Sequence, residues 1–280
     1  MSLNYIGGLF MLPMDVLSFD QYQIVYNVIS FTFAAMLASF VFFVLARSQV
    51  AEKYRGALVM SALVVVVAGY HYLRIFESWT SAYALQKGVY MPSGTPFNDA
   101  YRYVDWLLTV PLLLAELVAV LRLQGGKDKY LMAKLMIAAA LMIALGYPGE
   151  TAGDNGTRLI WGTLSTIPFI YILYVLWVQL SSSMDRQPAP VRVLVRNIRF
   201  LLLATWGFYP IAYLIPVFGL SGSTSTVALQ VGYSIADVAA KCGYGLMIYT
   251  IARRRTEADA QEGNVEVSNH VSDKLPAPVM

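Results

Sequence analysis

Long uncharged stretches dominate this chain and limit its possible folds more than any other feature. The run Ala57–Gly69 (ALVMSALVVVVAG) contains no charged residue and does not alternate between polar and apolar positions. A transmembrane helix needs about 20 mostly apolar residues, whereas a transmembrane strand of about 10 residues alternates in polarity. Hydrophobic residues make up 58% of the sequence and charged residues 13%, which is about half the charged share of a soluble domain. The sequence therefore predicts an all-α membrane protein and excludes a soluble enzyme.

Polar breaks divide the apolar sequence into seven predicted helices. Turn residues such as Pro92-Ser93-Gly94 mark these breaks, and the connection over 77–98 has room for a small hairpin. The predicted seven-helix domain covers 21–253, after an N-terminal segment at 1–20 and before a polar, disordered tail at 254–280. The helices are expected at 21–46, 54–77, 98–121, 129–149, 157–181, 193–217 and 227–253.

Basic residues are concentrated on one side of the predicted bundle. The opposite connections hold little beyond Lys87 and Arg158. Because basic connections are retained in the cytoplasm, the N-terminus is predicted outside and the C-terminus inside. The residues of the predicted cytoplasmic side are Arg47, Lys53, Arg55, Arg122, Lys127, Lys129, Arg186, Arg192, Arg196, Arg253, Arg254 and Arg255.

The predicted helix at 227–253 contains two residues of opposite charge. Asp237 and Lys241 are four residues apart, which places them on one face of the helix about one turn apart. Ionisable residues inside a membrane are expensive and usually functional, although an ion pair that only holds helices together is the simpler alternative. A lysine amine held away from water is also the group that forms a Schiff base with an aldehyde cofactor.

The predicted helix at 98–121 adds Arg102, Asp105, Thr109 and Glu116. Asp105 and Glu116 are eleven residues apart, so both lie on nearly one face with ~16 Å between them along the axis. Thr109 alone is weak evidence, since threonine often bonds to the backbone of its own helix. Two carboxylates on either side of a central lysine predict a proton path, with Asp105 toward the outside and Glu116 toward the cytoplasm.

These residues lie in segments that resemble microbial (type I) rhodopsins. Ala100–Pro111 (AYRYVDWLLTVP), with Glu116, is similar to their third helix, and Trp206–Pro210 (WGFYP) to their sixth. Asp237–Lys241 (DVAAK) is similar to their retinal-binding helix. The triplet of Asp, Thr and Glu is that of the proteorhodopsin and xanthorhodopsin outward proton pumps. Two further segments resemble xanthorhodopsins most, namely Gly69–Tyr72 (GYHY) and Tyr147–Glu150 (YPGE).

The resemblance implies a role for each matching residue. Lys241 would hold all-trans-retinal as a protonated Schiff base, and Asp105 would be its counterion and proton acceptor. Asp237 would be the second counterion, and Glu116 would be the proton donor. The implied partners are membrane lipid, protons and further copies of the chain in a ring such as a pentamer, with no metal and no nucleic acid. The residues expected to line the chromophore are Trp106, Leu113, Met142, Trp161, Ser165, Trp206, Tyr209 and Tyr213, although any one of these aromatic side chains alone would suggest ordinary core packing.

The buried charges balance in this arrangement. Lys241 and Arg102 supply the positive charges, and the two aspartates supply the negative ones, so that loss of one member leaves an uncompensated charge in a low dielectric. His71 is expected ~10 Å inside the membrane, at the depth of Asp105. A hydrogen bond between them would adjust how readily Asp105 accepts a proton. The alternatives for His71 are an interhelical contact or a contact between subunits.

Two pocket positions predict how the protein uses light. Leu113 lies eight residues after Asp105, where the resemblance to proteorhodopsins implies green absorption. Gly162 stands where many microbial rhodopsins carry a bulky aromatic side chain, and the resemblance to xanthorhodopsin implies a slot for a carotenoid antenna. Close helix packing is the alternative explanation for this glycine.

Other functions are weighed against the proton pump. A photosensory rhodopsin would use the same pocket, but it can dispense with Glu116, and no output domain is recognisable after Arg255. Retinal-based sodium or chloride pumps replace the carboxylate triplet, and a secondary transporter would favour an inverted repeat, which the sequence lacks. The predicted function is a light-driven outward proton pump, a multi-pass protein of the cell (inner) membrane rather than an enzyme.

Overall fold

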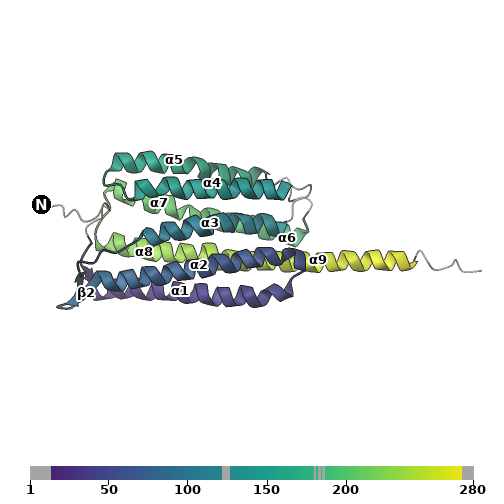
Figure 1. The fold of residues 1–280 in the computed structure, drawn as a ribbon, viewed down its shortest axis with the longest axis horizontal. Coiled ribbons are helices and arrows are strands. Elements are labelled where there is room, and N and C mark those ends of the chain that lie inside the picture. The colour runs from purple at the N-terminus through teal and green to yellow at the C-terminus, as the bar shows by residue number, and fades with distance from the viewer. Residues whose placement is uncertain (1–13, 122–126, 180, 182–183, 185–186, 273–280) are drawn as a thin grey trace, which may run out of the picture.

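Helices of membrane-spanning length form an elongated bundle in the computed structural model, which describes residues 14–121, 127–179, 181, 184 and 187–272 (Figure 1). Within these residues, seven helical segments are long and apolar enough to cross a membrane, which confirms the predicted architecture. The elements are α1 (Phe19–Ala46), α2 (Glu52–Ala82), α3 (Ala100–Leu121), α4 (Lys127–Glu150), α5 (Asn155–Tyr174) with a π-helical turn (Val175–Gln179), α6 (Ala189–Trp206) continued by α7 (Phe208–Leu214), α8 (Ser223–Asp237), a second π-helical turn (Val238–Gly243), α9 (Tyr244–Ser272), and short 3-10 turns at Arg47–Gln49 and Ile215–Phe218.

A small antiparallel sheet lies at one end of the bundle, which we call the hairpin end (Figure 1). The predicted hairpin is confirmed as β2 (Tyr83–Gln86) and β3 (Val89–Pro92). Its turn residues Lys87 and Gly88 have φ values of 48° and 86°, and positive φ at both positions is what a type I′ turn requires. The strand β1 (Leu17–Ser18) pairs with β3, so that the chain before α1 is fixed against the hairpin.

Side-chain caps define where two of the helices begin. The Ser18 hydroxyl accepts the backbone N–H of Gln21, and the Gln21 side chain accepts the N–H of Ser18, so this capping box satisfies two of the unpaired N–H groups at the start of α1. At the start of α5, the Asp154 carboxylate accepts the N–H of Thr157. This bond lowers the pKa of Asp154.

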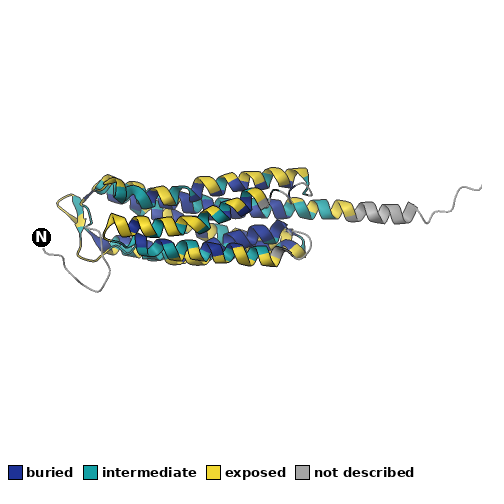
Figure 2. Ribbon diagram, turned by 90° about the horizontal axis from the view of Figure 1, so that it is seen from above, coloured by how far each residue is buried: buried dark blue, intermediate teal, exposed yellow. Residues whose placement is uncertain are grey.

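The core of the bundle surrounds α3. This helix contacts α2, α4 and α9, and buried residues occupy most of its length. The outward faces of the surrounding helices are exposed, as Figure 2 shows, and they carry large apolar side chains such as Phe31, Ile137 and Ile160. An apolar exterior is what a lipid environment favours. The arrangement places every polar side chain of α3 against another helix rather than against lipid.

The last helix is longer than the sequence analysis predicted. The tail was expected to be disordered from residue 254, but α9 continues to Ser272 and projects beyond the bundle (Figure 1). The segment 254–262 (RRTEADAQE) consists mostly of Arg, Glu, Ala and Gln, which favour helices. Arg253 and Arg254 also form ion pairs with Glu257, four and three residues further along, and pairs at these spacings stabilise a helix. Residues 1–13 and 273–280 of the predicted terminal segments lie outside the described residues.

Candidate functional site

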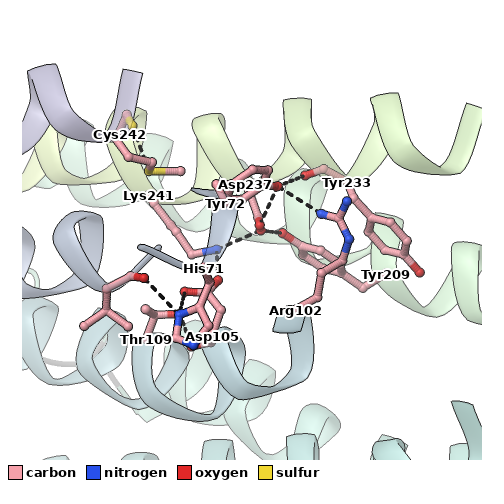
Figure 3. Close-up of polar contacts among 12 residues, drawn as sticks. His71, Tyr72, Arg102, Asp105, Thr109, Tyr209, Tyr233, Asp237, Lys241 and Cys242 are labelled. Carbon is pink, nitrogen blue, oxygen red and sulfur yellow. Dashed lines mark hydrogen bonds and ion pairs between the residues drawn. The ribbon is translucent and has the colours of Figure 1, made fainter. Parts of the chain in front are cut away.

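Three charged side chains meet in the middle of the bundle (Figure 3). The Nζ atom of Lys241 lies 2.9 Å from Asp105 Oδ2 and 2.8 Å from Asp237 Oδ1. The exposed fractions of these residues are 2% for Lys241 and 1% for each aspartate. Charges this deeply buried are stable only when they are paired. The structure therefore brings together the amine and both carboxylates that the sequence singled out.

Lys241 projects from the π-helical turn between α8 and α9. A π-helix carries i→i+5 hydrogen bonds, and such turns are rare and frequent at functional sites. Asp237 ends α8 immediately before this turn, so the backbone between the two charged residues departs from the α-helical path. The predicted continuous helix at 227–253 is interrupted at this point, and its hydrophobic pattern gave no sign of it.

Asp237 is held by two tyrosines from different helices. The Tyr72 hydroxyl of α2 donates to Asp237 Oδ2 at 2.8 Å, and the Tyr209 hydroxyl of α7 donates to Oδ1 at 2.5 Å (Figure 3). Asp105 differs, because among the described residues neither of its carboxylate oxygens has a hydrogen-bond donor apart from the ion pair with Lys241. Two phenol donors stabilise negative charge on Asp237. Asp105 keeps unused acceptor capacity.

Arg102 reaches the cluster through Tyr72 rather than directly. Its Nη1 donates to the Tyr72 hydroxyl at 3.1 Å, its Nη2 to Gln230 Oε1 at 2.5 Å, and its Nε to Asp99 Oδ1 at 2.6 Å. The guanidinium is buried, whereas 39% of the Asp99 side chain is exposed. A chain of hydrogen bonds thus runs from Asp237 to the surface at the hairpin end. Sequence reasoning assigned no role to Tyr72, Gln230 or Asp99.

His71 and Thr109 lie beside Asp105 without bonding to its carboxylate. The His71 Nδ1 atom is 3.9 Å from Asp105 Oδ1, which is too long for a hydrogen bond, and it contacts the Val67 carbonyl at 2.9 Å instead. The structure thus places His71 next to Asp105, as predicted, but it does not form the predicted hydrogen bond. The Thr109 hydroxyl donates to the backbone carbonyl of Asp105 at 2.8 Å, which is the local bond common for threonine in membrane helices.

Glu116 lies on the other side of Lys241 from Arg102 and is completely buried. The Ser61 hydroxyl of α2 approaches its Oε2 to 2.5 Å, and no described group bonds to Oε1. The Tyr244 hydroxyl ties the same region together by donating to the Leu113 carbonyl at 2.6 Å. Ser61 was missed by sequence reasoning, because its place opposite Glu116 depends on how α2 packs against α3.

A cavity of about 330 Å³ begins at Lys241 and extends between α3, α4, α5 and α7. Its volume falls in the usual range for a small-molecule site. The wall is mainly apolar and aromatic, and the only charged residue in the described lining is Lys241. The predicted chromophore residues that line it are Trp106, Leu113, Met142, Ser165, Trp206, Tyr209 and Tyr213, and Gly162, which was predicted as a carotenoid slot, lines it as well.

Trp161 is the one predicted pocket residue that the structure places elsewhere. It is not in the lining of the cavity, and its Cβ atom lies against Gly149 of α4. Successive residues of a helix point about 100° apart, so the face of α5 that presents Gly162 to the cavity turns Trp161 away from it. The prediction that Trp161 lines the chromophore is therefore wrong, whereas Gly162 does line the cavity and its role as a carotenoid slot stays a prediction.

Gly162 packs directly against Tyr213. A Cβ atom on this glycine would lie 2.7 Å from Tyr213 Cε1, so only glycine allows the ring to lie on the backbone of α5. The same part of the cavity wall contains Leu159, Thr163 and Thr166, whose side chains are exposed on the outside of the bundle. The cavity therefore opens toward the outer surface beside α5.

The residues present fit a long apolar aldehyde. The cavity is a channel of aromatic and aliphatic side chains with one amine at its end, and the Lys241 nitrogen has no hydrogen-bond partner beyond its ion pairs in the described residues. Such an amine can form a covalent bond with a carbonyl carbon. The charges of Asp105 and Asp237 would stabilise the cation that results.

Comparison with known proteins gives consistent matches along the whole bundle. The family described as Bacteriorhodopsin-like protein matches residues 23–254. Green-light absorbing proteorhodopsin of Gamma-proteobacterium EBAC31A08 is 30% identical over 222 residues, which cover 78% of this chain and 82% of that protein. Bacteriorhodopsin of Halobacterium salinarum is 31% identical over 177 residues, which cover 61% of this chain and 64% of that protein.

Solved structures match the fold as well as the sequence. The crystallographic structure of xanthorhodopsin, described as a light-driven ion pump with dual chromophore, has a TM-score of 0.86 and 57% identity, and the match covers 89% of this chain and 99% of that one. A crystal structure of thermophilic rhodopsin has a TM-score of 0.86 and 53% identity, covering 88% and 99% of the two chains.

Proposed function

Since the chain belongs to the bacteriorhodopsin-like family, we propose that it is a light-driven outward proton pump with all-trans-retinal attached to Lys241 as a protonated Schiff base. It is a multi-pass protein of the cell membrane, and members of its family are ion transporters rather than enzymes. The observation that supports the proposal best is the contact of Lys241 Nζ with two buried carboxylates at 2.8 and 2.9 Å at the end of an apolar cavity.

In the resting state every charge of the central cluster has a partner. Lys241 pairs with Asp105 and Asp237, Arg102 pairs with Asp99, and the tyrosine bonds fix Asp237 in its place. Retinal, when bound, supplies the light-driven isomerisation that changes the environment of the Lys241 nitrogen. The proton of this nitrogen then passes to Asp105, which has unused acceptor capacity, rather than to Asp237, whose charge is already stabilised by two hydroxyl donors.

Glu116 returns a proton to the Lys241 nitrogen. Its carboxyl group is fully buried, and in the described structure it has Ser61 as a partner but no cation. An ionised carboxylate in such a place is costly, so the group holds its proton until the Lys241 nitrogen has lost its own. Vectorial transport requires that Glu116 and Asp105 exchange protons with opposite sides of the membrane in alternating states.

The distribution of basic residues supports the outward direction. The connections near Glu116 carry most of the lysines and arginines, and because basic connections are retained in the cytoplasm, we propose that this end of the bundle is cytoplasmic and the hairpin end is outside. Protons therefore enter on the Glu116 side and leave on the side of Arg102 and Asp99. The bonds from Tyr72 through Arg102 to the part-exposed Asp99 support an exit in this direction.

The proposal is tested by illuminating cells that express the chain and contain all-trans-retinal. External pH is recorded with and without a protonophore, and Lys241→Ala serves as the control. We expect light-dependent acidification that the protonophore abolishes and that the control lacks. Alkalinisation would contradict the outward direction. A coloured protein that produces no pH change would point to a photosensor.

We also propose that the opening beside Gly162 receives a carotenoid that passes its excitation to retinal. The cavity reaches the outer surface at Leu159, Thr163 and Thr166, so an apolar ring could enter from lipid without a covalent bond. The description of xanthorhodopsin as a pump with dual chromophore supports this second chromophore. Packing of Gly162 against Tyr213 is the competing explanation for the glycine.

An action spectrum of pumping after incubation with a hydroxylated or keto-carotenoid distinguishes these explanations. The wild type should show an added band in the carotenoid region, and Gly162→Trp should lose this band while it continues to pump. Because a side chain at 162 must displace Tyr213, the matched control is Ile160→Trp, which adds the same group to an exposed, lipid-facing position of α5. The antenna proposal fails if the wild type shows no added band or if Gly162→Trp keeps one.

A further inference from the structure

A polar cluster joins the projecting helix α9 to α2 at the cytoplasmic end. The Tyr54 hydroxyl donates to Asp259 Oδ2 at 2.8 Å, and Lys53 Nζ forms an ion pair with the same oxygen at 2.9 Å. The Nε atom of Arg255 donates to the Tyr54 hydroxyl at 3.1 Å. Tyr54 is fully buried, whereas 31% of the Asp259 side chain is exposed. The cluster therefore connects the interior to cytoplasmic water.

The same cluster touches the end of α3. Arg255 Nη1 donates to the carbonyls of Val120 and Leu121, which are among the last of this helix and have no partner within it. Val120 follows Glu116 by four residues, a separation of ~6 Å along the helix. Arg255 thus anchors the turn of α3 that comes directly after the proton donor.

One face of α2 contacts both the cluster and Glu116, through Tyr54 and Ser61 respectively. Tyr54 and Ser61 are seven residues apart, which places them on one face of α2 with ~10 Å between them. The layer between these levels is apolar, since Leu58 of α2 and Leu117 of α3, which follows Glu116 in the chain, are fully buried in one hydrophobic cluster. A proton that moves from water to Glu116 must cross this short apolar layer, and the Asp259 carboxylate is held at its outer end.

We propose that Asp259 is the carboxylate that collects protons from the cytoplasm for Glu116, an inference that rests on the proposed pump function. After Glu116 has given its proton to the Lys241 nitrogen, Asp259 takes a proton from water and releases it inward, and the Glu116 carboxylate binds it. Only O–H bonds break and form in this transfer. Lys53 and Tyr54 from α2 and Arg255 from α9 are the groups that face Asp259. These groups hold the Asp259 carboxylate in place. Because two of them are cations, they favour release of the proton that Asp259 has taken up.

The test is proton uptake after a flash, measured with a pH-indicator dye in purified, retinal-bound protein. A positioned acid–base group typically speeds proton transfer by about 10²–10⁴-fold, so Asp259→Asn should slow uptake at least about tenfold. A mobile buffer such as imidazole should restore the rate, because it replaces the missing carrier. Asp259→Glu should behave like the wild type. The matched control is Glu257→Gln, which removes an exposed carboxylate that pairs with Arg253 and Arg254 on the same helix.

The outcomes separate this inference from the pump proposal. Wild-type uptake in Asp259→Asn would overturn the inference, and so would slow uptake that mobile buffer does not restore, because that result indicates a structural clamp. Tyr54→Phe keeps the carboxylate but removes the bond that positions it, and it should give a smaller slowing that the same buffer corrects. Transfer from the Lys241 nitrogen to Asp105 comes before uptake. Its absence in the wild type would count against the pump itself.

Discussion

Replacing Glu116 by glutamine isolates the proton-donor step. The amide keeps the size of the side chain and can still bond to Ser61, whose hydroxyl is 2.5 Å from Glu116 Oε2, but it has no proton to give. A positioned proton donor typically contributes 10²–10⁴-fold to the rate of transfer, so reprotonation of the Lys241 nitrogen should slow by at least about 10²-fold. The visible absorption maximum should not move, since the charges next to Lys241 are unchanged.

The pH dependence of the Glu116→Gln variant gives a second, independent number. Its protons must come from water, and diffusion-limited capture allows roughly 10²–10³ per second at pH 7, before the buried layer around position 116 adds its own barrier. This maximum rate of capture falls tenfold for each unit rise in pH. An internal donor, by contrast, makes the rate of the wild-type step nearly independent of pH. Flash photolysis between pH 6 and 9 measures both slopes. Azide, a small mobile acid, should partly restore the variant.

A normal photocycle of Glu116→Gln at high pH would refute the assignment of Glu116 as the donor. Equal pH slopes for variant and wild type would refute it as well, because the wild type would then also depend on protons from water. Glu77→Gln is a suitable control, since it removes an exposed carboxylate near the opposite end of the bundle. This control should leave recovery unchanged at every pH.

Three further predictions concern the chromophore and its counterion. Lys241→Ala should give a colourless protein in absorption spectroscopy, because Lys241 is the buried lysine at the cavity among the described residues, and retained covalent retinal would refute this. Asp105→Asn should shift the absorption maximum to the red and abolish pumping, since it removes a negative charge 2.9 Å from the cation; an unshifted maximum would contradict the counterion role. The purified pigment should absorb green light, because Leu113 adds no dipole to the cavity wall, and a blue maximum would show that other pocket residues dominate.

The sequence predicted the spans because burial in lipid leaves a strong signal along the chain. Charged residues within an apolar helix were conspicuous for the same reason, which is why Lys241, Asp105, Asp237 and Glu116 were found. Their spacing along α3 and along the last predicted span at 227–253 also gave their relative depths. Hydropathy and spacing describe each helix separately and contain no information on how neighbouring helices pack.

Partners on neighbouring helices could not be predicted in the same way. Tyr72 and Ser61 are ordinary residues of an apolar helix until the packing of α2 against α8 and α3 is known, which brings them to Asp237 and Glu116 respectively. The prediction for Trp161 was wrong for a related reason. An error of one residue along a helix turns the side chain by about 100° and moves it to another face. The continuation of α9 was missed because hydropathy reports membrane crossing and not helix length.

The π-helical turn at Val238–Gly243 has a consequence for how the last span can change in length. A single deletion within a regular helix rotates everything beyond it by about 100°, and in α9 this would carry Asp259 away from Tyr54. A π turn contains one residue more than the α-helical path requires, so it can lose a residue and leave both flanking helices in register. Gly243, where an added Cβ would meet nothing within 4 Å, is the natural residue to lose. A one-residue deletion is thus tolerated best in the turn that positions the Lys241 amine, and such a deletion should preserve the bundle and alter the pigment.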